Sequence, residues 1–146
     1  MEIRELQAKD RDVFIQMVDD FYHSEAVLHD IPKENILHTA DLLIEGTPYA
    51  KGYLFEQNGE TAGYGQISLT YSNEAGGLCV WVEEVMILPQ FRGQGLGHEF
   101  FHFLHREFSQ AKRFRLEVTK ENPRAAKLYE KLGYEPFDYL QMVKEC

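Results

Sequence analysis

The residues best suited to chemistry lie in a glycine-rich stretch, Arg92-Gly93-Gln94-Gly95-Leu96-Gly97-His98. It follows an apolar, β-branched run of strand length, and an amphipathic segment with helical spacing comes after it. Glycines at alternate positions let the backbone turn tightly or let a ligand approach it closely. A helix that begins just after such a loop directs unpaired N–H groups and the positive end of its dipole at one point. The pattern therefore predicts an anion site, typically for phosphate, to which Arg92 adds a charge-assisted hydrogen bond.

Two familiar phosphate-binding patterns do not fit this loop. A P-loop requires Gly-x4-Gly-Lys-Ser/Thr, and no Lys-Ser/Thr pair is present. A dinucleotide fingerprint requires Gly-x-Gly-x-x-Gly, whereas these glycines stand at 93, 95 and 97 and residue 98 is His. The loop therefore belongs to another class of anion site.

Two consecutive carboxylates, Glu83 and Glu84, lie in the middle of the apolar strand that leads into the loop. A buried carboxylate without a partner is costly, so the pair calls for an explanation. Consecutive strand residues face opposite sides of a sheet, so we expect one of the two to face a cleft. There it could take up a proton as a general base. The alternative for each is a salt-bridged or solvated position.

The first half of the chain predicts an antiparallel meander with two early helices. Asp10 is placed to cap the first helix, and Asn58-Gly59 is a strong hairpin signal. Gly63 and Gly65 within one strand indicate a bend or close packing. The expected helices cover 10–21 and 33–45, and the expected strands cover 2–6, 49–56, 61–70 and 78–88.

The second half predicts a crossover followed by a closing segment. A helix over 96–108 is followed by a strand over 113–119, so this strand should lie parallel to the strand at 80–88. A further helix begins at Asn122-Pro123 and ends at Gly133. One or two strands are expected within 135–143.

Two motifs resemble the GNAT superfamily of N-acetyltransferases. Arg92 to Gly97 resembles its Gln/Arg-x-x-Gly-x-Gly/Ala signature, and Asn122 to Tyr129 with Leu132-Gly133-Tyr134 is similar to its Asn-x-x-Ala-x-x-x-Tyr motif followed by Leu-Gly-Phe/Tyr. The resemblance implies an α+β fold over 1–146 as a single domain. Its mostly antiparallel, twisted central sheet would have about 6–7 strands with one parallel, splayed pair, and about four helices would cover both faces.

The resemblance also implies a cofactor site for acetyl-CoA. The loop would hold the pyrophosphate, the backbone of the strand before it would bind the pantetheine arm, and Asn122 would contact that arm. The alternative for Asn122 is a helix cap. The implied cofactor-binding residues are Val85, Met86, Ile87, Arg92, Gly93, Gln94, Gly95, Leu96, Gly97, His98 and Asn122.

The implied catalytic groups are one tyrosine and three carboxylates. Tyr129 would protonate the departing thiolate, with a packing role as the alternative. Candidates for the base are Glu83, Glu84 and Glu117. Glu83 is preferred because alternation would place it on one face with Trp81 and Val85.

The function implied is an acetyl-CoA-dependent N-acetyltransferase, an acyltransferase that acts by direct attack in a ternary complex. The acceptor would be a primary amine of a small molecule or peptide, and a homodimer is expected because relatives are often dimers. The alternative is a noncatalytic acyl-CoA-binding module. His98, His102 and His105 share helical spacing, but a solvated face is favoured over a metal site, and no metal is expected.

Composition excludes several other classes. The net charge of −9 disfavours nucleic-acid binding. No apolar run reaches the roughly 18 residues of a membrane span, and the first residues lack the apolar core of a signal peptide. With only two cysteines, Cys79 and Cys146, a disulfide framework is not expected and a reducing, cytoplasmic setting fits.

Overall fold

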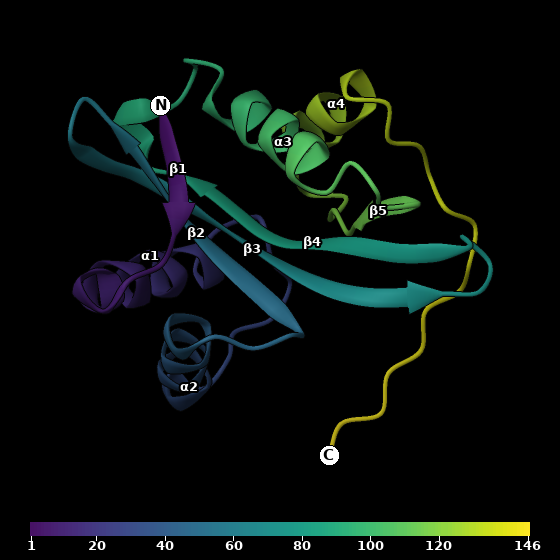
Figure 1. The fold of residues 1–146 in the computed structure, drawn as a ribbon, viewed down its shortest axis with the longest axis horizontal. Coiled ribbons are helices and arrows are strands. Elements are labelled where there is room, and N and C mark those ends of the chain that lie inside the picture. Colours follow the sequence, from purple (N-terminus) through teal and green to yellow (C-terminus); the bar gives the residue numbers. More distant parts are fainter.

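A five-stranded sheet in the order β1-β2-β3-β4-β5 organises the computed structural model, which describes residues 1–146 (Figure 1). Strands β1 to β4 pair antiparallel, and β5 pairs parallel to β4, as the strand–helix–strand order predicts. The strands are β1 (Glu2–Glu5), β2 (Ala50–Gln57), β3 (Glu60–Ser72), β4 (Gly77–Ile87) and β5 (Arg113–Leu116). The helices are α1 (Arg11–Tyr22), α2 (Lys33–Glu45), α3 (Leu96–Glu107) and α4 (Pro123–Lys131), with short 3-10 turns at Ala8–Asp10 and Pro89–Phe91.

Helices cover both faces of the sheet, with α1 and α2 on one face and α3 and α4 on the other (Figure 1). Each face has its own apolar core, one centred on Phe14 and Tyr64 and the other on Phe100 and Phe101. The predicted close packing at Gly65 is present, because a Cβ there would overlap the Phe100 ring. None of the helices is long and apolar enough to cross a membrane.

Local turn signals are placed where the sequence predicts them. Asn58 and Gly59 both have positive φ, 53° and 78°, which gives the tight hairpin between β2 and β3. Gly133 has φ 95° and lies just beyond the last turn of α4. Asp10 precedes α1, but its carboxylate caps nothing there and instead binds the Arg4 guanidinium at 2.7 and 3.0 Å.

The expected sheet of 6–7 strands is wrong, because no strand forms after α4. The segment 135–143, where one or two strands were expected, contacts the sheet through side chains rather than through a β-ladder. The Phe137 ring lies 4.8 Å from the Arg113 guanidinium and 5.0 Å from that of Arg115, and the Tyr139 hydroxyl donates to Glu74. The tail therefore runs past the β3–β4 hairpin without adding to the sheet (Figure 1).

Candidate active site

A β-bulge in β4 determines where its two carboxylates point. The pairing of β3 with β4 passes from Ile67–Val82 to Gln66–Glu84, so Glu83 is an extra residue without a partner. Val82 and Val85, three positions apart, consequently pack into the same core against α3. The expectation that only one carboxylate faces a cleft is wrong, because both Glu83 and Glu84 line one cavity on the opposite face. For the same reason Glu83 does not share a face with Val85.

Glu84 is held rigidly by two tyrosines. The Tyr22 hydroxyl from α1 donates to one carboxylate oxygen at 2.7 Å, and the Tyr64 hydroxyl from β3 donates to the other at 2.7 Å. Burial raises the pKa of Glu84 above its usual value, and the two hydrogen bonds oppose that shift. Burial also raises the pKa of both tyrosines, so they remain hydrogen-bond donors at neutral pH.

The cavity beside the bulge is acidic and partly apolar. Its volume is about 340 Å³. Glu117, which follows the end of β5, brings a third carboxylate to it, and Glu83 accepts a hydrogen bond from the Ser68 hydroxyl at 2.7 Å. The cavity is lined by Phe14, Val18, Tyr22, Ile31, Ile36, Thr39, Gln66, Glu83, Glu84 and Glu117. The fold thus brings together the three carboxylates that the sequence marked as candidates.

Strands β4 and β5 diverge next to this cavity. Their ladder ends at Val82–Leu116, and β4 continues to Ile87 with no partner on that side. The expected strand over 113–119 stops at Leu116, three residues early. The backbone of Val85 to Ile87 therefore has one free edge, which is the feature expected for binding an extended arm.

The glycine loop leaves a run of amide groups unpaired. None of the N–H groups from Gly93 to His98 donates to a backbone carbonyl, while Gly93 and Gly95 adopt φ of 77° and 80°. A Cβ at either glycine would meet no atom within 4 Å, so the space around the loop is open. Arg92 donates from Nε to the Ile87 carbonyl at 2.9 Å, which ties the loop to the end of β4. The loop geometry suits an anion at the start of α3.

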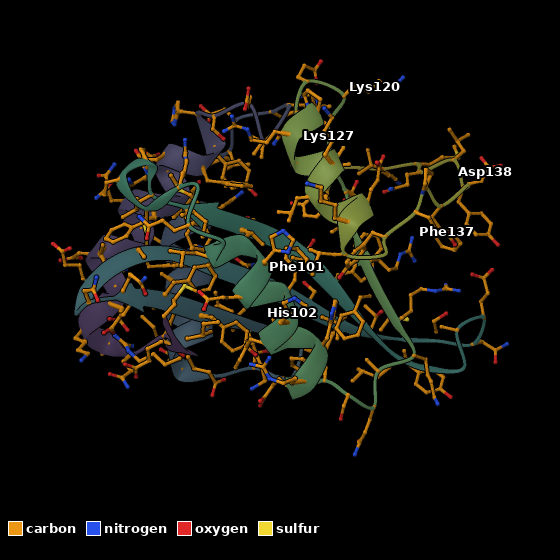
Figure 2. The ribbon with its side chains drawn as sticks, turned by 90° about the horizontal axis from the view of Figure 1, so that it is seen from above. Phe101, His102, Lys120, Lys127, Phe137 and Asp138 are labelled. Atoms are coloured by element: carbon orange, nitrogen blue, oxygen red, sulfur yellow. The ribbon has the colours of Figure 1, made fainter.

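A basic groove that the motif reasoning missed borders this loop. It lies between the start of α3 and α4, has a volume of about 460 Å³, and is lined by His98, Pro123, Arg124, Lys127, Leu128 and Lys131. Lys127 is labelled on α4 in Figure 2, beside α3. The three cations recur at i, i+3 and i+7 of α4, a spacing that places them on one helix face and could have revealed the groove.

Tyr129 belongs to the same helix, α4, and its ring packs against aromatic rings. Its ring centroid is 5.5 Å from that of Phe101 and 6.2 Å from that of Tyr134, and burial raises the pKa of its hydroxyl. Asn122 caps α4, since its side-chain oxygen accepts from the Ala125 N–H at 3.3 Å. The cap uses only the oxygen, which leaves the amide NH₂ free to donate.

The three histidines of α3 have different environments. His102 is exposed, and its ring centroid lies 6.4 Å from that of His98. His105, however, packs against Phe114 and donates or accepts at 3.2 Å with the Tyr134 hydroxyl, so the expected solvated face does not include it. Burial lowers the pKa of His105. The structure contains no group of three or more His, Cys, Asp or Glu placed to hold a metal ion.

One strand, β4, thus connects a cavity lined by carboxylates at its bulge with a glycine loop whose N–H groups are unpaired. The chain matches the Acetyltransferase (GNAT) family over residues 14–134, and it belongs to that family. It is an N-acetyltransferase that uses acetyl-CoA. It is 31% identical over 131 residues to the "Putative ribosomal protein bS18-alanine N-acetyltransferase" of Bacillus subtilis (strain 168), covering 86% of this chain and 80% of that protein.

Solved structures of low sequence identity share the fold. A possible acetyltransferase from Clostridium difficile 630 superposes with a TM-score of 0.84 at 19% identity, covering 99% of this chain and 97% of that one. The aminoglycoside N-acetyltransferase AAC(6')-Iy, in complex with a bisubstrate analogue of CoA, gives a TM-score of 0.80 at 15% identity, with coverage of 99% and 97%. The ribosomal-protein-alanine N-acetyltransferase from Brucella melitensis biovar Abortus 2308 gives 0.74 at 16% identity and covers both chains fully.

Proposed function

We propose that this chain transfers the acetyl group of acetyl-CoA to a primary amine of a small molecule or peptide by direct attack in a ternary complex. The proposal rests on one observation: two cavities of opposite charge lie along the same strand, one at the bulge of β4 and one beside the loop that follows it. The cavity at the bulge of β4 is lined by three carboxylates, and the groove beside the loop that follows β4 is lined by three Lys and Arg side chains. The donor is anionic through its phosphates, and an amine acceptor is cationic at neutral pH.

The residues on the loop side fit coenzyme A. Free N–H groups from Gly93 to His98 would receive the pyrophosphate, and Arg124 and Lys127 would add charge at the groove. The free edge of β4 at Val85 to Ile87 would hold the pantetheine arm, with the Asn122 amide as a further donor. A backbone N–H aimed at the developing oxyanion is worth about 3–4 kcal/mol of barrier.

The chain's carboxylates would prepare the acceptor. An alkyl amine has a pKa of about 10.4, so well under about 1% of it is nucleophilic at neutral pH. Glu83 and Glu117 are exposed enough to exchange a proton with solvent, whereas Glu84 has both oxygens occupied by tyrosines. We assign proton removal to Glu83 or Glu117, and a fixed, charge-holding role to Glu84.

Tyr129 would complete the reaction on the donor side. Bound acetyl-CoA supplies a thioester whose acetyl carbon forms the new C–N bond as its C–S bond breaks and the sulfur leaves as a thiolate. Burial keeps the Tyr129 phenol protonated at neutral pH, so it has a proton to give to that sulfur. A charged acceptor loses two protons in all: the carboxylate takes up one before the attack, and the nitrogen releases the other to solvent once the C–N bond has formed. The phenol then regains its proton from solvent and the carboxylate releases its own, so one proton is released overall.

The relatives support an amine acceptor without fixing its size. The name of the Bacillus protein specifies an alanine amino group of a ribosomal protein, and the name of AAC(6')-Iy specifies an aminoglycoside. Both acceptors are amines. A protein amino terminus and a small cationic molecule are therefore the two classes to compare first.

The test combines binding with turnover. Acetyl-CoA at saturation should raise the melting temperature, and release of free thiol should appear with at least one member of a panel of cationic amines and peptides. Lys9→Gln is the control for loss of a positive charge, because Lys9 lies in the 3-10 turn Ala8–Asp10 and lines neither cavity. It should leave both the thermal shift and the thiol release unchanged. Absence of any thermal shift would exclude acetyl-CoA binding, and binding without turnover across the whole panel would favour the noncatalytic module.

A further inference from the structure

Arg115 is the one partly buried arginine of the chain whose guanidinium has no polar partner. Arg4, Arg11 and Arg113 are also partly buried, and each forms an ion pair with a carboxylate. No ion pair of the protein includes Arg115. Because no buried side-chain nitrogen lacks a hydrogen-bond partner, the unpaired N–H groups of Arg115 reach solvent. They are therefore open to a ligand.

Two aromatic rings hold this guanidinium in place. Cζ of Arg115 lies 4.1 Å from the centroid of the Trp81 ring and 5.0 Å from that of Phe137, which belongs to the segment after α4 (Figure 2). Stacking uses the faces of a guanidinium and leaves its N–H groups at the edge. The neighbouring Arg113 is paired with Glu74 at 2.8 Å. Arg115 thus presents a positioned positive charge whose hydrogen-bonding capacity is unused.

The Arg115 side chain lies on the face of the sheet that holds the acidic cavity. Its chain neighbours Phe114 and Leu116 pack against the core under α3, so alternation turns Arg115 to the opposite face. Glu117, which lines the cavity, follows two residues later. Two residues of extended chain span about 7 Å, so the guanidinium borders the cavity.

A row of side chains across three strands connects Arg115 with Glu83. Ser68 on β3 pairs with Trp81 on β4, and Trp81 pairs with Arg115 on β5. The Ser68 hydroxyl donates to Glu83 at 2.7 Å, so a carboxylate lies at one end of the row and the guanidinium at the other. Two strand spacings are about 10 Å, and an extended peptide covers about 3.3–3.6 Å per residue. The carboxylates and the guanidinium are therefore two or three peptide residues apart.

We propose that the acceptor is the amino terminus of a peptide that carries an acidic side chain at its second or third residue. The amino group lies beside Glu83 or Glu117, and the acidic side chain binds Arg115 next to the Trp81 ring. A carboxylate matches the fork of a guanidinium, with which it forms two parallel hydrogen bonds. This inference rests on the proposed function and specifies its acceptor. Arg115 is then a specificity-determining residue, and Phe137 helps to position it.

Binding measured by calorimetry on the CoA-saturated protein tests the proposal without requiring turnover. The probes are three tripeptide amides that begin with alanine and continue with two glutamates, two glutamines or two lysines. We expect the glutamate peptide to bind about tenfold more tightly than the glutamine peptide, because a hydrogen bond to a charged group supplies about that much. Arg115→Gln should reduce this ratio to within about twofold.

Reversal of the charge separates recognition from a merely structural role. Arg115→Glu should make the lysine peptide the tightest of the three, whereas a misfolded variant would lose affinity for all of them. Should Arg115→Glu fail to fold, Arg115→Lys keeps the charge without the fork and should leave a ratio of about threefold. Arg106→Gln, which removes an exposed cation of α3 that lines neither cavity, is the matched control and should keep the full ratio.

Three results would overturn the proposal. They are equal affinity for the glutamate and glutamine peptides, an unchanged ratio in Arg115→Gln, and tighter binding of a free ω-amino acid such as ε-aminocaproate than of the glutamate peptide. The last result would assign the carboxylate to a small molecule. Failure of the proposed function is distinguishable from all three, because it would appear as no thermal shift with acetyl-CoA or no thiol release with any amine.

Discussion

Removing the Tyr64 hydroxyl tests how Glu84 is held. Tyr64 is fully buried, its ring packs edge-on against Phe14 with centroids 5.2 Å apart, and its hydroxyl donates to Glu84 at 2.7 Å. Tyr64→Phe keeps the ring and its packing but removes the donor. One oxygen of Glu84 then loses its partner, while Tyr22 still serves the other.

The size of the effect follows from the charge on the acceptor. A hydrogen bond to a charged group contributes about 1.5–3 kcal/mol, and we expect Tyr64→Phe to lower the free energy of unfolding by about 2 kcal/mol at neutral pH. Tyr71→Phe is the control, because Tyr71 is 79% exposed and its hydroxyl makes no hydrogen bond with the protein. It should change the free energy by less than about 0.5 kcal/mol.

The effect should depend on pH in one direction. Burial raises the pKa of Glu84 in the folded state, so its contribution to stability is greatest when it is protonated and is lost as pH rises through that raised pKa. The tyrosine hydrogen bonds favour the ionised form, so removing one raises the folded-state pKa of Glu84 further. The destabilisation by Tyr64→Phe is therefore smallest in acid and grows as pH rises through the pKa of Glu84.

Urea unfolding measures both features. With a slope of about 2 kcal/mol per molar urea, the midpoint of Tyr64→Phe should fall by about 1 M at neutral pH, and by less at about pH 4. A midpoint equal to that of Tyr71→Phe at neutral pH would refute the anchoring of Glu84. A loss that is larger in acid would refute the sign of the argument.

Three further predictions concern the donor side. The double variant Arg124→Gln/Lys127→Gln should weaken acetyl-CoA binding by about tenfold in calorimetry, because two exposed cations contribute about 0.5–1 kcal/mol each. This loss of affinity should be smaller at high salt. An unchanged affinity would exclude the basic groove as part of the coenzyme site. Tyr129→Phe should lower kcat by about 100-fold with little change in the affinity for acetyl-CoA, as expected for a lost general acid, and full activity would reduce Tyr129 to a packing role. Gly95→Ala places a Cβ at φ 80° and should lower stability by about 1–2 kcal/mol in urea unfolding, whereas a neutral result would mean that the loop relaxes without strain.

The sequence was sufficient to predict the elements whose signals are local. The glycine loop, the cap at Asn122 and the hairpin at Asn58-Gly59 each depend on a few neighbouring residues, and each lies where it was expected. The parallel pairing of β4 and β5 followed from the order strand–helix–strand alone. Short-range backbone preferences and the rules for connecting strands therefore determine this part of the fold.

The sequence failed where the outcome depends on partners far along the chain. The bulge at Glu83 arises from the register between β3 and β4, which no local pattern near Glu83 specifies. Phe137 and Tyr139 alternate as in a strand, but Arg113, Arg115 and Glu74 offer them side-chain contacts instead of a ladder. His105 was expected on a solvated face. It is not solvated because it contacts Tyr134, which lies 29 positions further along the chain and which helical spacing alone does not reveal.

The bulge at Glu83 links the fold to the chemistry that we propose. A regular strand would place the side chains of Glu83 and Glu84 on opposite faces, and one carboxylate would enter the apolar core around Phe100 at a large cost. The extra residue places both in the cavity and brings Val85 back to the core face, so Val85 to Ile87 reach the loop with their backbone edge free. The position of both carboxylates on the cavity face thus depends on a single irregularity in β4. Deleting Glu83 would leave Val82 paired with Ile67 and Glu84 paired with Gln66 in a regular ladder, so Glu84 should stay on the cavity face and Val85 on the core face. Only the Glu83 carboxylate should be lost from the cavity, and acetyl-CoA binding measured by calorimetry should persist.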